Sequence, residues 1–440
     1  MKVMHFPFCY DPDPPGGTEL YVRALALELR TMGVTNVICA PGAHEAHYER
    51  DGLPVWRFAA NTAPGDLRIL YGEGDVAAAS QVGRIIGVEQ PDIVHLHALT
   101  SGVSLKILRQ ARRHDCRLVF TYHTPTVSCL QGTLLREGAR SCDGCMRTAR
   151  CTRCLAAGRG AGPALARVLG WLPPSAGRVL GALGLRGRPG TALRCSELVA
   201  LRHRTVRRFL QETDAIVAVC GWAVRLLERN GVPAGKLTLN RHGVAAVRST
   251  APERALERRD PNVRLRVAFL GRLHPAKGAH DLVAAFRGAP QLKATLDFYG
   301  IPQDGAGEGY ARQIRAEANG DSRMVFRGQL EPAEVVDVLG RYDLLAVPSR
   351  TFETGPMVVL EAFAAGTPVI GWNIAGVNEL VGHEVNGLLV DLPAIQGWIS
   401  ALHRCADEPW LLPRLRRGVC APRSMKQVAL EMLALYRTLK

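Results

Sequence analysis

The strongest constraint on the fold is a regular alternation of strand-like and helix-like segments, which occurs in two series. In the first series, short apolar runs are predicted to be buried strands at residues 2–8, 36–40, 91–97, 117–123 and 214–220, with helical patterns between them, such as 18–33 and 104–114. The second series has strand-like runs at 266–273, 294–300, 324–328, 343–349, 367–372 and 386–390. Such alternation is typical of parallel sheets with helices on both faces. We therefore predict an α/β fold of two doubly wound, Rossmann-like domains that face a ligand-binding cleft.

The predicted domains cover residues 1–246 and 262–420, and a charged stretch at 247–264 joins them. With 440 residues, 47% of them hydrophobic, the chain is long enough to form two full cores. The last segment, 421–440, contains an amphipathic helix that we expect to pack back on the body of the protein. Residues 124–211 separate two strands of the first domain by far more than an ordinary connection, which indicates an insertion.

The N-terminal segment carries charges and prolines and does not resemble a signal peptide. No run of about 18 uncharged apolar residues occurs, so the sequence predicts no transmembrane helix, and we expect a cytoplasmic protein. The net charge of +15 would suit nucleic acid, a membrane surface or anionic substrates. Most of this excess lies in one segment, because residues 136–208 contain 15 arginines, no lysine and three acids.

One carboxylate of the second domain lies in an unexpected place. Glu361 interrupts an otherwise apolar run between Pro356 and Gly366, and this pattern predicts a buried helix that begins with the proline. A buried carboxylate is costly without a partner. Glu353 lies in the loop that feeds the same helix, so the two carboxylates could accept hydrogen bonds from two groups of one elongated ligand. Pairing of Glu361 with an arginine or a backbone group would satisfy it equally well.

Basic residues follow the first strand of the same domain. Gly271 and Arg272 end the strand, and Lys277 opens the next helix. The forked donors of arginine and the point charge of lysine both suit a diphosphate, although surface cations at a strand–helix turn are the alternative. Further anion-binding donors would be the backbone N–H groups at the predicted helix start, those of Gly355, Met357 and Val358.

Together these motifs resemble those of family 4 glycosyltransferases, which have the GT-B fold. The resemblance rests on E-x7-E at 353–361 followed by AFAAGTPVI, GVNELV and NGLLV, on GRLHPAKG at 271–278, and on PPGGTEL near the start. It implies a retaining enzyme, without a catalytic metal, that transfers a sugar from a nucleotide-diphosphate sugar to an acceptor hydroxyl in glycan, glycolipid or glycosylated-metabolite synthesis. The donor would bind the second domain, and a sugar, lipid-linked or small-molecule acceptor the first.

The resemblance also implies roles for single residues. Glu361 would accept hydrogen bonds from ribose hydroxyls, and Glu353 from a hydroxyl of the donor sugar. Arg272 and Lys277 would bind the diphosphate and stabilise its charge as the glycosidic bond breaks. The implied catalytic residues are Glu353, His123, Arg272 and Lys277. The other implied donor-site residues are Gly16, Gly17, Gly271, Thr354, Gly355, Met357 and Val358.

Four cysteines of the insertion have the spacing of a metal site. Cys142-x2-Cys145-x5-Cys151-x2-Cys154 contains two CxxC pairs, which predict a closed tetrahedral thiolate site with structural zinc. An iron–sulfur cluster or reduced thiols without metal are the alternatives, and Cys129 could replace one ligand.

Beyond these cysteines, two short amphipathic helices are predicted in an arginine-rich context. The apolar positions are Leu165, Val168, Leu169 and Leu172, and then Val179, Leu180 and Leu183 after Pro173–Pro174. The pattern is compatible with contact with an anionic membrane surface, at the inner face of the membrane, and equally with ordinary docking onto the first domain.

Other functions remain open at this point. His95 and His97 lie two residues apart on one strand and so face one way, which suits a metal pair or strand-end packing. An epimerase or a phosphorylase could use the same two-domain scaffold. A zinc-dependent module that binds nucleic acid would explain the basic insertion, but the only aromatic residues between 124 and 211 are Trp171 and Phe209, so platforms for base stacking are scarce.

Overall fold

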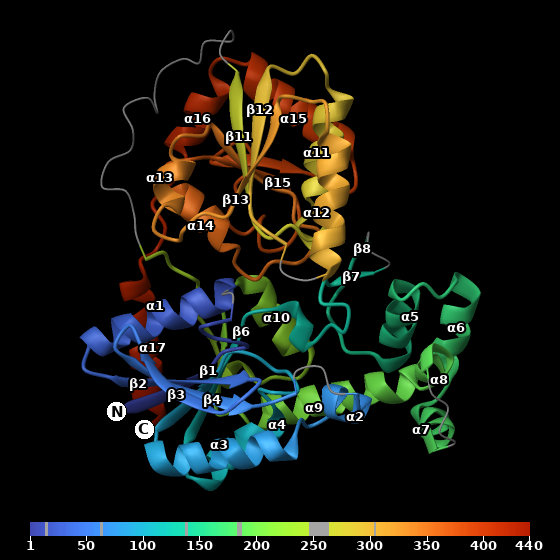
Figure 1. The fold of residues 1–440 in the computed structure, drawn as a ribbon, viewed down its shortest axis with the longest axis vertical. Coiled ribbons are helices and arrows are strands. Elements are labelled where there is room, and N and C mark those ends of the chain that lie inside the picture. The colour runs from blue at the N-terminus through green and yellow to red at the C-terminus, as the bar shows by residue number, and fades with distance from the viewer. Residues whose placement is uncertain (14–15, 62–64, 137–139, 183–186, 246–263, 303–304) are drawn as a thin grey trace. The chain divides into compact units, whose positions relative to one another are not determined.

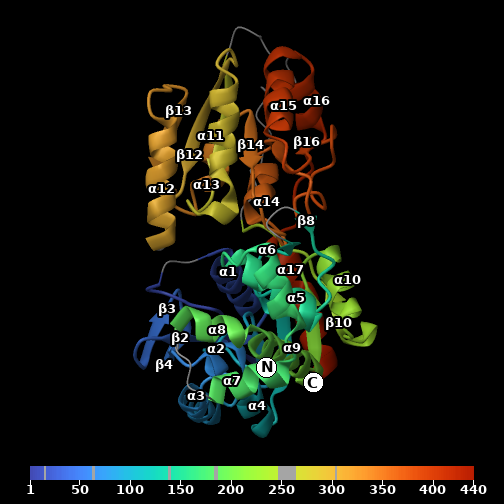
Figure 2. The same cartoon turned by 90° about the vertical axis from the view of Figure 1, so that its right-hand side faces the viewer.

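The computed structural model describes residues 1–13, 16–61, 65–136, 140–182, 187–245, 264–302 and 305–440. Within them the chain forms two compact units, Met1–Arg241 with Met425–Lys440, and His242–Ser424 (Figures 1 and 2). Residues 246–263, which include nearly all of the charged stretch predicted to join the domains, lie outside the described residues, as do Pro14 and Pro15 of the N-terminal motif.

The first unit is built on an eight-stranded sheet with the order β10-β9-β6-β5-β1-β2-β4-β3. Its strands are β1 (Lys2–Phe6), β2 (Thr35–Gly42), β3 (Ala46–Arg50), β4 (Leu53–Ala59), β5 (Ile93–Leu96), β6 (Arg117–Tyr122), β9 (Ala215–Ala218) and β10 (Leu237–Leu239). Every pair is parallel except β3 with β4. The strand order reverses between β1 and β5, so this sheet is doubly wound.

The β3–β4 hairpin at the edge of this sheet is absent from the sequence prediction. Asp51 and Gly52 form its turn, and both have positive φ, at 55° and 71°. An Asp-Gly pair is the usual signal of a two-residue hairpin turn, because both positions tolerate this left-handed conformation. The dipeptide could therefore have revealed the hairpin.

Helices cover both faces of the first sheet. They are α1 (Gly17–Thr31), α2 (Leu67–Tyr71), α3 (Val76–Glu89), α4 (Leu105–Arg113), α10 (Gly221–Arg229) and α17 (Met425–Leu439), with short 3-10 turns at Pro125–Val127 and Ala234–Lys236. Val428, Met432 and Tyr436 of α17 share one core with Val22 and Leu25 of α1. The C-terminal helix therefore packs on the first unit.

The long segment between β6 and β9 is mainly helical. It contains the short hairpin β7 (Leu135–Arg136) and β8 (Arg140–Ser141), followed by α5 (Thr148–Gly158), α6 (Pro163–Trp171), α7 (Pro174–Ala182), α8 (Gly187–Leu193) and α9 (Cys195–Glu212). Helices α5, α6, α7 and α8 gather at one side of the first unit, against α9 (Figure 1). Helix α9 then returns the chain to the sheet, where it packs on α4 and α2.

The second unit is built on a six-stranded, wholly parallel sheet with the order β13-β12-β11-β14-β15-β16. The strands are β11 (Leu265–Leu270), β12 (Ala294–Tyr299), β13 (Met324–Gly328), β14 (Leu344–Val347), β15 (Val369–Trp372) and β16 (Gly387–Val390). The helices are α11 (Ala279–Gly288), α12 (Gly305–Ala318), α13 (Val335–Leu339), α14 (Met357–Ala364), α15 (Ile395–Asp407) and α16 (Leu411–Arg417), with a 3-10 turn at Pro275–Lys277. This strand order is that of a doubly wound sheet, so the predicted fold class is confirmed for both units.

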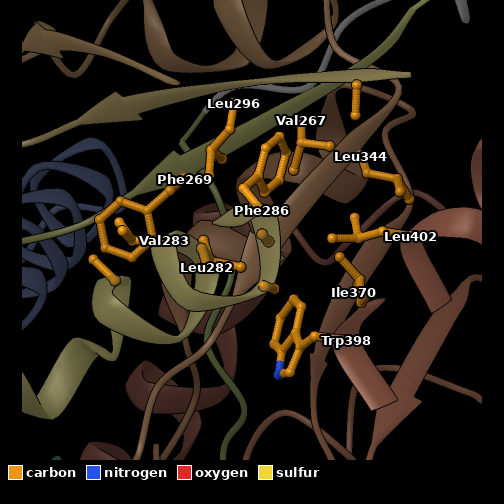
Figure 3. Packing of buried hydrophobic residues seen from close by; sticks show 14 of the residues in the cluster. Val267, Phe269, Leu282, Val283, Phe286, Leu296, Leu344, Ile370, Trp398 and Leu402 are labelled. Carbon is orange, nitrogen blue, oxygen red and sulfur yellow. The ribbon is translucent and has the colours of Figure 1, made fainter. Parts of the chain in front are cut away.

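Apolar side chains from both layers fill the core of the second unit. Figure 3 shows Val267 and Phe269 of β11 beside Leu282 and Phe286 of α11, with Trp398 of α15 farther along the same cluster. All five are fully or almost fully buried. The same cluster includes residues of both β11 and β14, the strands whose carboxyl ends flank the place at which a ligand of such a fold binds.

The predicted helix around Glu361 is present as α14. Pro356 is the N-cap residue, with φ −63° and ψ 107°, and not the first helical residue as the sequence predicted. The helix ends before Gly366, which adopts a positive φ of 73°. The apolar run is buried on most sides, since Val359, Ala362 and neighbouring residues lie in the core, whereas Glu361 is only partly buried.

Candidate functional site

The strand order of the second unit defines one place for a ligand. It reverses between β11 and β14, and ligands of doubly wound sheets bind in the crevice outside the carboxyl ends of the strands at this switch point. The loop after β11 carries Gly271, Arg272 and Lys277, and the loop after β14 carries Glu353. The fold therefore brings together the residues that the two sequence motifs contributed separately.

Lys277 and Glu353 are in direct contact. The Lys277 Nζ donates to Oε1 of Glu353 at 2.7 Å, and the hydroxyl of Ser349 donates to the same oxygen at 2.7 Å. Burial opposes the charge of Glu353, but Lys277, Ser349 and the nearby Arg272 together hold its carboxyl pKa below the usual range. Glu353 is thus a carboxylate at neutral pH, and it orients the ammonium group of Lys277.

Gly278 brings the two loops close to each other. Its φ is 71°, and a Cβ at this position would lie 1.9 Å from the carbonyl oxygen of Pro348, which directly follows β14. The backbone N–H of Arg350 also donates to the carbonyl of Ala276 at 2.9 Å. Only glycine permits this backbone approach, and the approach places Lys277 opposite Ser349.

A buried carboxylate also holds the loop that follows β14 in place. Asp281, at the start of α11, is almost fully buried and accepts hydrogen bonds from the Nε of Arg350 at 2.7 Å and from the indole N–H of Trp372 at 3.2 Å. From the other side, Gly376 has a φ of 93°, and a Cβ there would lie 1.8 Å from the carbonyl oxygen of Glu353. Packing on both sides therefore fixes the loop that carries Glu353.

Glu361 has no comparable partner. Within the described part of the chain, its carboxyl group makes no hydrogen bond or ion pair, so neither the arginine nor the backbone partner considered from the sequence is found. Burial raises the pKa of this carboxyl from 4.5 to about 7. A partly buried carboxyl with an unstable charge is suited to a ligand whose hydroxyl groups donate to it.

The remaining predicted donor residues lie around these groups. Thr354 is buried, and the carbonyl of Gly355 accepts a hydrogen bond from Nδ1 of His242 at 3.1 Å. The side chain of Arg272 is exposed beside Glu353. Met357 and Val358 are the first two residues of α14, where backbone N–H groups have no acceptor within the helix.

In the first unit, the predicted glycines open α1. Gly16 is the N-cap and Gly17 the first helical residue. The Gly16 N–H already donates to the carboxylate of Glu19 at 2.9 Å, so a phosphate would have to displace that carboxylate to reach this donor. His123 follows β6, and its ring packs edge-on against Tyr21 of α1 with the centroids 4.9 Å apart. The start of α1 and His123 thus belong to one site.

A row of hydrogen-bonded imidazoles leads to His123. The Nδ2 of Asn36 donates to two backbone carbonyl oxygens at 3.1 and 2.9 Å, so its Oδ1 is an acceptor for Nε2 of His5 at 3.1 Å. Nδ1 of His5 lies 3.2 Å from Nε2 of His97, and Nδ1 of His97 lies 3.0 Å from Nε2 of His123. We call Asn36, His5, His97 and His123 the histidine relay.

Burial keeps the inner rings of the relay neutral. It lowers the pKa of His5 to about 4, and burial together with the neighbouring imidazoles lowers the pKa of His97 well below its ordinary value. If each ring has one proton and Asn36 offers the relay only its Oδ1 as an acceptor, every Nε2 in the relay donates and every Nδ1 accepts. Nδ1 is therefore the acceptor atom of His123.

His95 faces the same way as His97, as the strand spacing predicted, with ring centroids 3.9 Å apart. Within the described residues, His5, His95 and His97 form the one group of three such side chains whose ligand atoms all lie within 4.8 Å of one another. However, His95 already bonds Tyr436 at 2.6 Å and Thr121 at 2.7 Å through its two nitrogens. These bonds favour strand-end packing over the metal pair.

The four cysteines predicted to bind metal line one cavity of the insertion. They are Cys142, Cys145, Cys151 and Cys154, and Cys129 lines the same cavity.

Several residues of these sites are absent from the sequence analysis. Ser349, Asp281 and Gly376 contact or brace the Glu353 loop, but single polar residues and glycines in loops give no distinctive signal. His5 could have been found, since a histidine inside the apolar strand KVMHF poses the same question as Glu361. Asn36, which precedes an apolar strand run, is less conspicuous.

The whole chain has the fold of solved glycosyltransferase structures. A sucrose-phosphate synthase from Thermosynechococcus elongatus is similar with a TM-score of 0.68 and 19% identity, covering 100% of this chain and 98% of that one. HepE from Anabaena, solved in complex with UDP-glucose, is similar with a TM-score of 0.62 and 15% identity, and both chains are covered completely. The fold class of this chain is therefore GT-B.

Residues 16–243 match the glycosyl transferase 4-like domain, and residues 255–417 match the glycosyl transferases group 1. Among curated proteins, a D-inositol 3-phosphate glycosyltransferase from Rhodococcus jostii is 30% identical over 247 residues, which are 54% of this chain and 52% of that protein. A glycogen synthase from Mycobacterium tuberculosis is 29% identical over 222 residues, 49% of this chain and 51% of that protein. The matches thus span about half the length of these relatives. The chain belongs to the glycosyltransferase family with a 4-like N-terminal domain, as the sequence motifs predicted.

Proposed function

We propose that this chain transfers a sugar from a nucleotide-diphosphate sugar to an acceptor hydroxyl, with retention of the anomeric configuration. The observation that carries the proposal is Glu361, a partly buried carboxyl that has no partner among the described residues, on the helix that follows the Lys277–Glu353 pair. Two ribose hydroxyls would supply the hydrogen bonds that the protein does not. The cation and the second carboxylate would then meet the diphosphate and the sugar of the same elongated donor.

The cationic side chains of the site would bind the diphosphate leaving group. The Lys277 ammonium has three donors, of which Glu353 takes one, so two can reach phosphate oxygens, and Arg272 adds a forked, permanently charged donor. The backbone N–H groups of Met357 and Val358 would add the positive end of α14. These groups stabilise the charge that develops as the glycosidic bond breaks.

In this proposal the leaving phosphate takes the proton of the acceptor hydroxyl. No side chain acts as a nucleophile. Glu353 is held as a carboxylate by Lys277 and Ser349, and in this proposal it accepts a hydrogen bond from a sugar hydroxyl. His123, with Nδ1 as its acceptor atom, would orient a hydroxyl on the acceptor side. The family provides the retaining outcome, and the residues above provide its binding and electrostatic parts.

The reaction can be tested before the acceptor is known. In such sites water can take the place of the acceptor, so the enzyme slowly hydrolyses its nucleotide sugar. Proton NMR would follow the first-formed anomer of the sugar released from each of several nucleotide sugars. Release of the donor's own anomer with loss of nucleotide supports the proposal. Release of the opposite anomer, conversion of one nucleotide sugar into another, or turnover that requires inorganic phosphate would refute it, the last two in favour of an epimerase or a phosphorylase.

We further propose that the protein works at the cytoplasmic face of an anionic membrane, where a lipid-linked acceptor would be accessible. Helix α6 buries Ala166 and Leu169 but exposes Leu165, Val168 and Trp171, the last with 81% of its surface exposed. The exposed Arg167 lies among them. Tryptophan and aliphatic groups beside arginines suit the headgroup region.

The second predicted apolar stripe is described only in part. On α7, Val179 is exposed together with Arg178, the side chain of Leu180 is not described, and Leu183 lies outside the described residues. No helix of the described residues is both long and apolar enough to cross a bilayer. Flotation with vesicles of phosphatidylglycerol and of phosphatidylcholine tests the contact. Trp171→Ala should reduce binding to the anionic vesicles, and Trp410→Ala, which alters an exposed tryptophan of the other unit, should not; equal binding of all three proteins would refute it.

A further inference from the structure

Five cysteines from three segments of the insertion surround one cavity of about 30 Å³. Cys129 lies in the loop after β6, Cys142 and Cys145 lie between β8 and α5, and Cys151 and Cys154 lie on α5. All five side chains are partly exposed, and none of them forms a disulfide within the described residues. We call this the cysteine cavity.

The local structure explains how the two CxxC pairs come to face the same space. Cys151 and Cys154 are separated by about one turn of α5, so they project on one side of the helix. The other pair encloses a tight turn in which Gly144 has a φ of 73°, and the carboxylate of Asp143 accepts the N–H of Cys145 at 3.0 Å. A Cβ on Gly144 would lie 2.4 Å from a methyl carbon of Leu226, so the turn is packed against α10 and requires glycine.

The fifth cysteine connects the cavity to the loop that begins with His123, directly after β6. The loop after β6 is folded locally, because the N–H of Cys129 donates to the carbonyl of Pro125 at 2.8 Å. The hydroxyl of Ser128 in this loop lies 2.8 Å from that of Tyr122, the last residue of β6. The side-chain amide of Gln131 then donates to the carbonyl of Cys154 at 2.7 Å, which joins this loop to α5.

Positive charge lines the cavity beside the sulfurs. Arg136 and Arg150 are both lining residues. Arg150 donates to the carboxylate of Asp143 at 2.8 Å and to the carbonyl of Cys145 at 2.7 Å, while its buried Nε has no hydrogen-bond acceptor among the described residues. An unsatisfied buried N–H is costly, and thiolate sulfur bound to a metal would be an acceptor for it.

We propose that the cysteine cavity binds a metal centre through thiolates, and that this centre fastens the insertion to the loop that follows His123. Each observation above points to the same chemistry: convergent thiols from three segments, nearby guanidinium charge, and a buried donor that lacks an acceptor. Four thiolates around Zn²⁺ would carry a net charge of −2, which the arginines offset. Because the cavity offers five thiols and a tetrahedral ion takes four, every coordination position would be filled by the protein, so the role of the site is structural.

Zinc and an iron–sulfur cluster share this thiolate ligation. Around zinc the sulfurs would lie about 3.8 Å apart, given Zn–S bonds of about 2.3 Å. In the described part of the chain, no three of these sulfurs lie within 4.8 Å of one another. Zinc therefore requires the cysteines to draw closer, whereas a cluster, whose iron and sulfide atoms lie between the thiolates, fits a wider ring.

The test is a metal analysis of the full-length protein, purified without oxygen from cells supplied with zinc and iron. We expect either one equivalent of zinc in a colourless protein, or several equivalents of iron with acid-labile sulfide and visible absorbance. Cys151→Ser should lose most of this metal, and Cys420→Ser, which alters an exposed cysteine of the other unit, should retain it. Wild-type protein without stoichiometric metal, or full retention by Cys151→Ser, would overturn the proposal.

A second measurement is independent of whether Cys151→Ser folds. Alkylation of the native wild-type protein, read by peptide mass spectrometry, should modify Cys420 rapidly and the cysteines of the cavity slowly. A strong chelator should release the metal and make the latter reactive. Equal alkylation of both groups before chelation would contradict metal binding. Neither measurement depends on sugar transfer.

Discussion

Replacing Glu361 by glutamine should stabilise the ligand-free second unit at alkaline pH. Burial raises the carboxyl pKa from 4.5 to about 7, so the folded protein binds this proton more tightly than the unfolded chain does. The associated stability is fully present below pH 4.5 and is lost as the pH rises through 7. The complete difference corresponds to about 3 kcal/mol as an upper value, and glutamine, which has nearly the same shape and no charge, avoids the loss.

Thermal unfolding of the wild type and Glu361→Gln at pH 5.5 and pH 8.5 measures this difference. For a unit of this size, each kcal/mol changes the unfolding temperature by about 2–4 °C. We expect the variant to unfold at a higher temperature than the wild type at pH 8.5. At pH 5.5 the difference between their unfolding temperatures should be small. Glu331→Gln, at an exposed position after the edge strand β13, is the control and should change neither value. Equal stability of the wild type and Glu361→Gln at pH 8.5 would refute the absence of a protein partner.

The same variant should bind nucleotide more weakly, because a carboxylate accepts both ribose hydroxyl bonds and an amide oxygen accepts them less strongly. Hydrogen bonds to a charged group contribute about 1.5–3 kcal/mol, which corresponds to a loss of about tenfold or more in affinity. Since the ligand binds the charged form, wild-type affinity should fall as the pH decreases below 7. A variant that is more stable and yet binds worse is the pattern expected of a residue kept for function.

Three further outcomes follow from the structure. Gly278→Ala should destabilise the second unit and lower nucleotide affinity, because its Cβ would collide with the carbonyl of Pro348; Gly320→Ala has a similar φ of 85° and open space, so it should show only the smaller cost of backbone strain. Asn36→Ala should lower the rate of sugar transfer and cost about 1–3 kcal/mol of stability, by leaving His5 without its acceptor, while nucleotide affinity stays unchanged; an unchanged transfer rate would contradict a positioning role for the histidine relay. The first unit should also lose stability as the pH falls from 6.5 toward 4, because its histidines gain protons in the unfolded chain while burial keeps them neutral in the folded protein, and denaturant unfolding at several pH values would detect this.

Much of the fold was predictable because its pattern is local. Apolar runs separated by amphipathic segments located the central strands of both sheets, and the unusual polarity of Glu361 within an apolar helix located one end of the site. The donor motifs were also legible as local sequence, from GRLHPAKG to E-x7-E. The local sequence does not show which residues each motif contacts in the folded protein. The contact between Gly278 and Pro348 joins residues from two loops, and their approach depends on the strand order, which periodicity does not contain.

Other features could not be predicted from the sequence because they depend on contacts that form only in the folded chain. The sequence offered an arginine or a backbone group as partners for Glu361, and only the packed structure shows that neither reaches it in the described part of the chain. The tautomers of the histidine relay depend on the orientation of Asn36, which two backbone carbonyls set after the chain has folded. From its spacing in the sequence, Cys129 could be identified only as a possible replacement for one of the four ligands. The fold places it on the same cavity as the two CxxC pairs.

The central claim is that the second unit binds a nucleotide diphosphate and its sugar through Lys277, Glu353 and Glu361. Calorimetric titration with UDP, GDP, ADP and TDP, and with their common sugar conjugates, tests it most directly on the wild type and Lys277→Ala. The account predicts clear binding of one nucleotide, weakened by about tenfold or more in the variant, since Lys277 makes charge-assisted bonds to the diphosphate. Folded wild-type protein that binds none of them, or equal affinity of the two proteins, would contradict it.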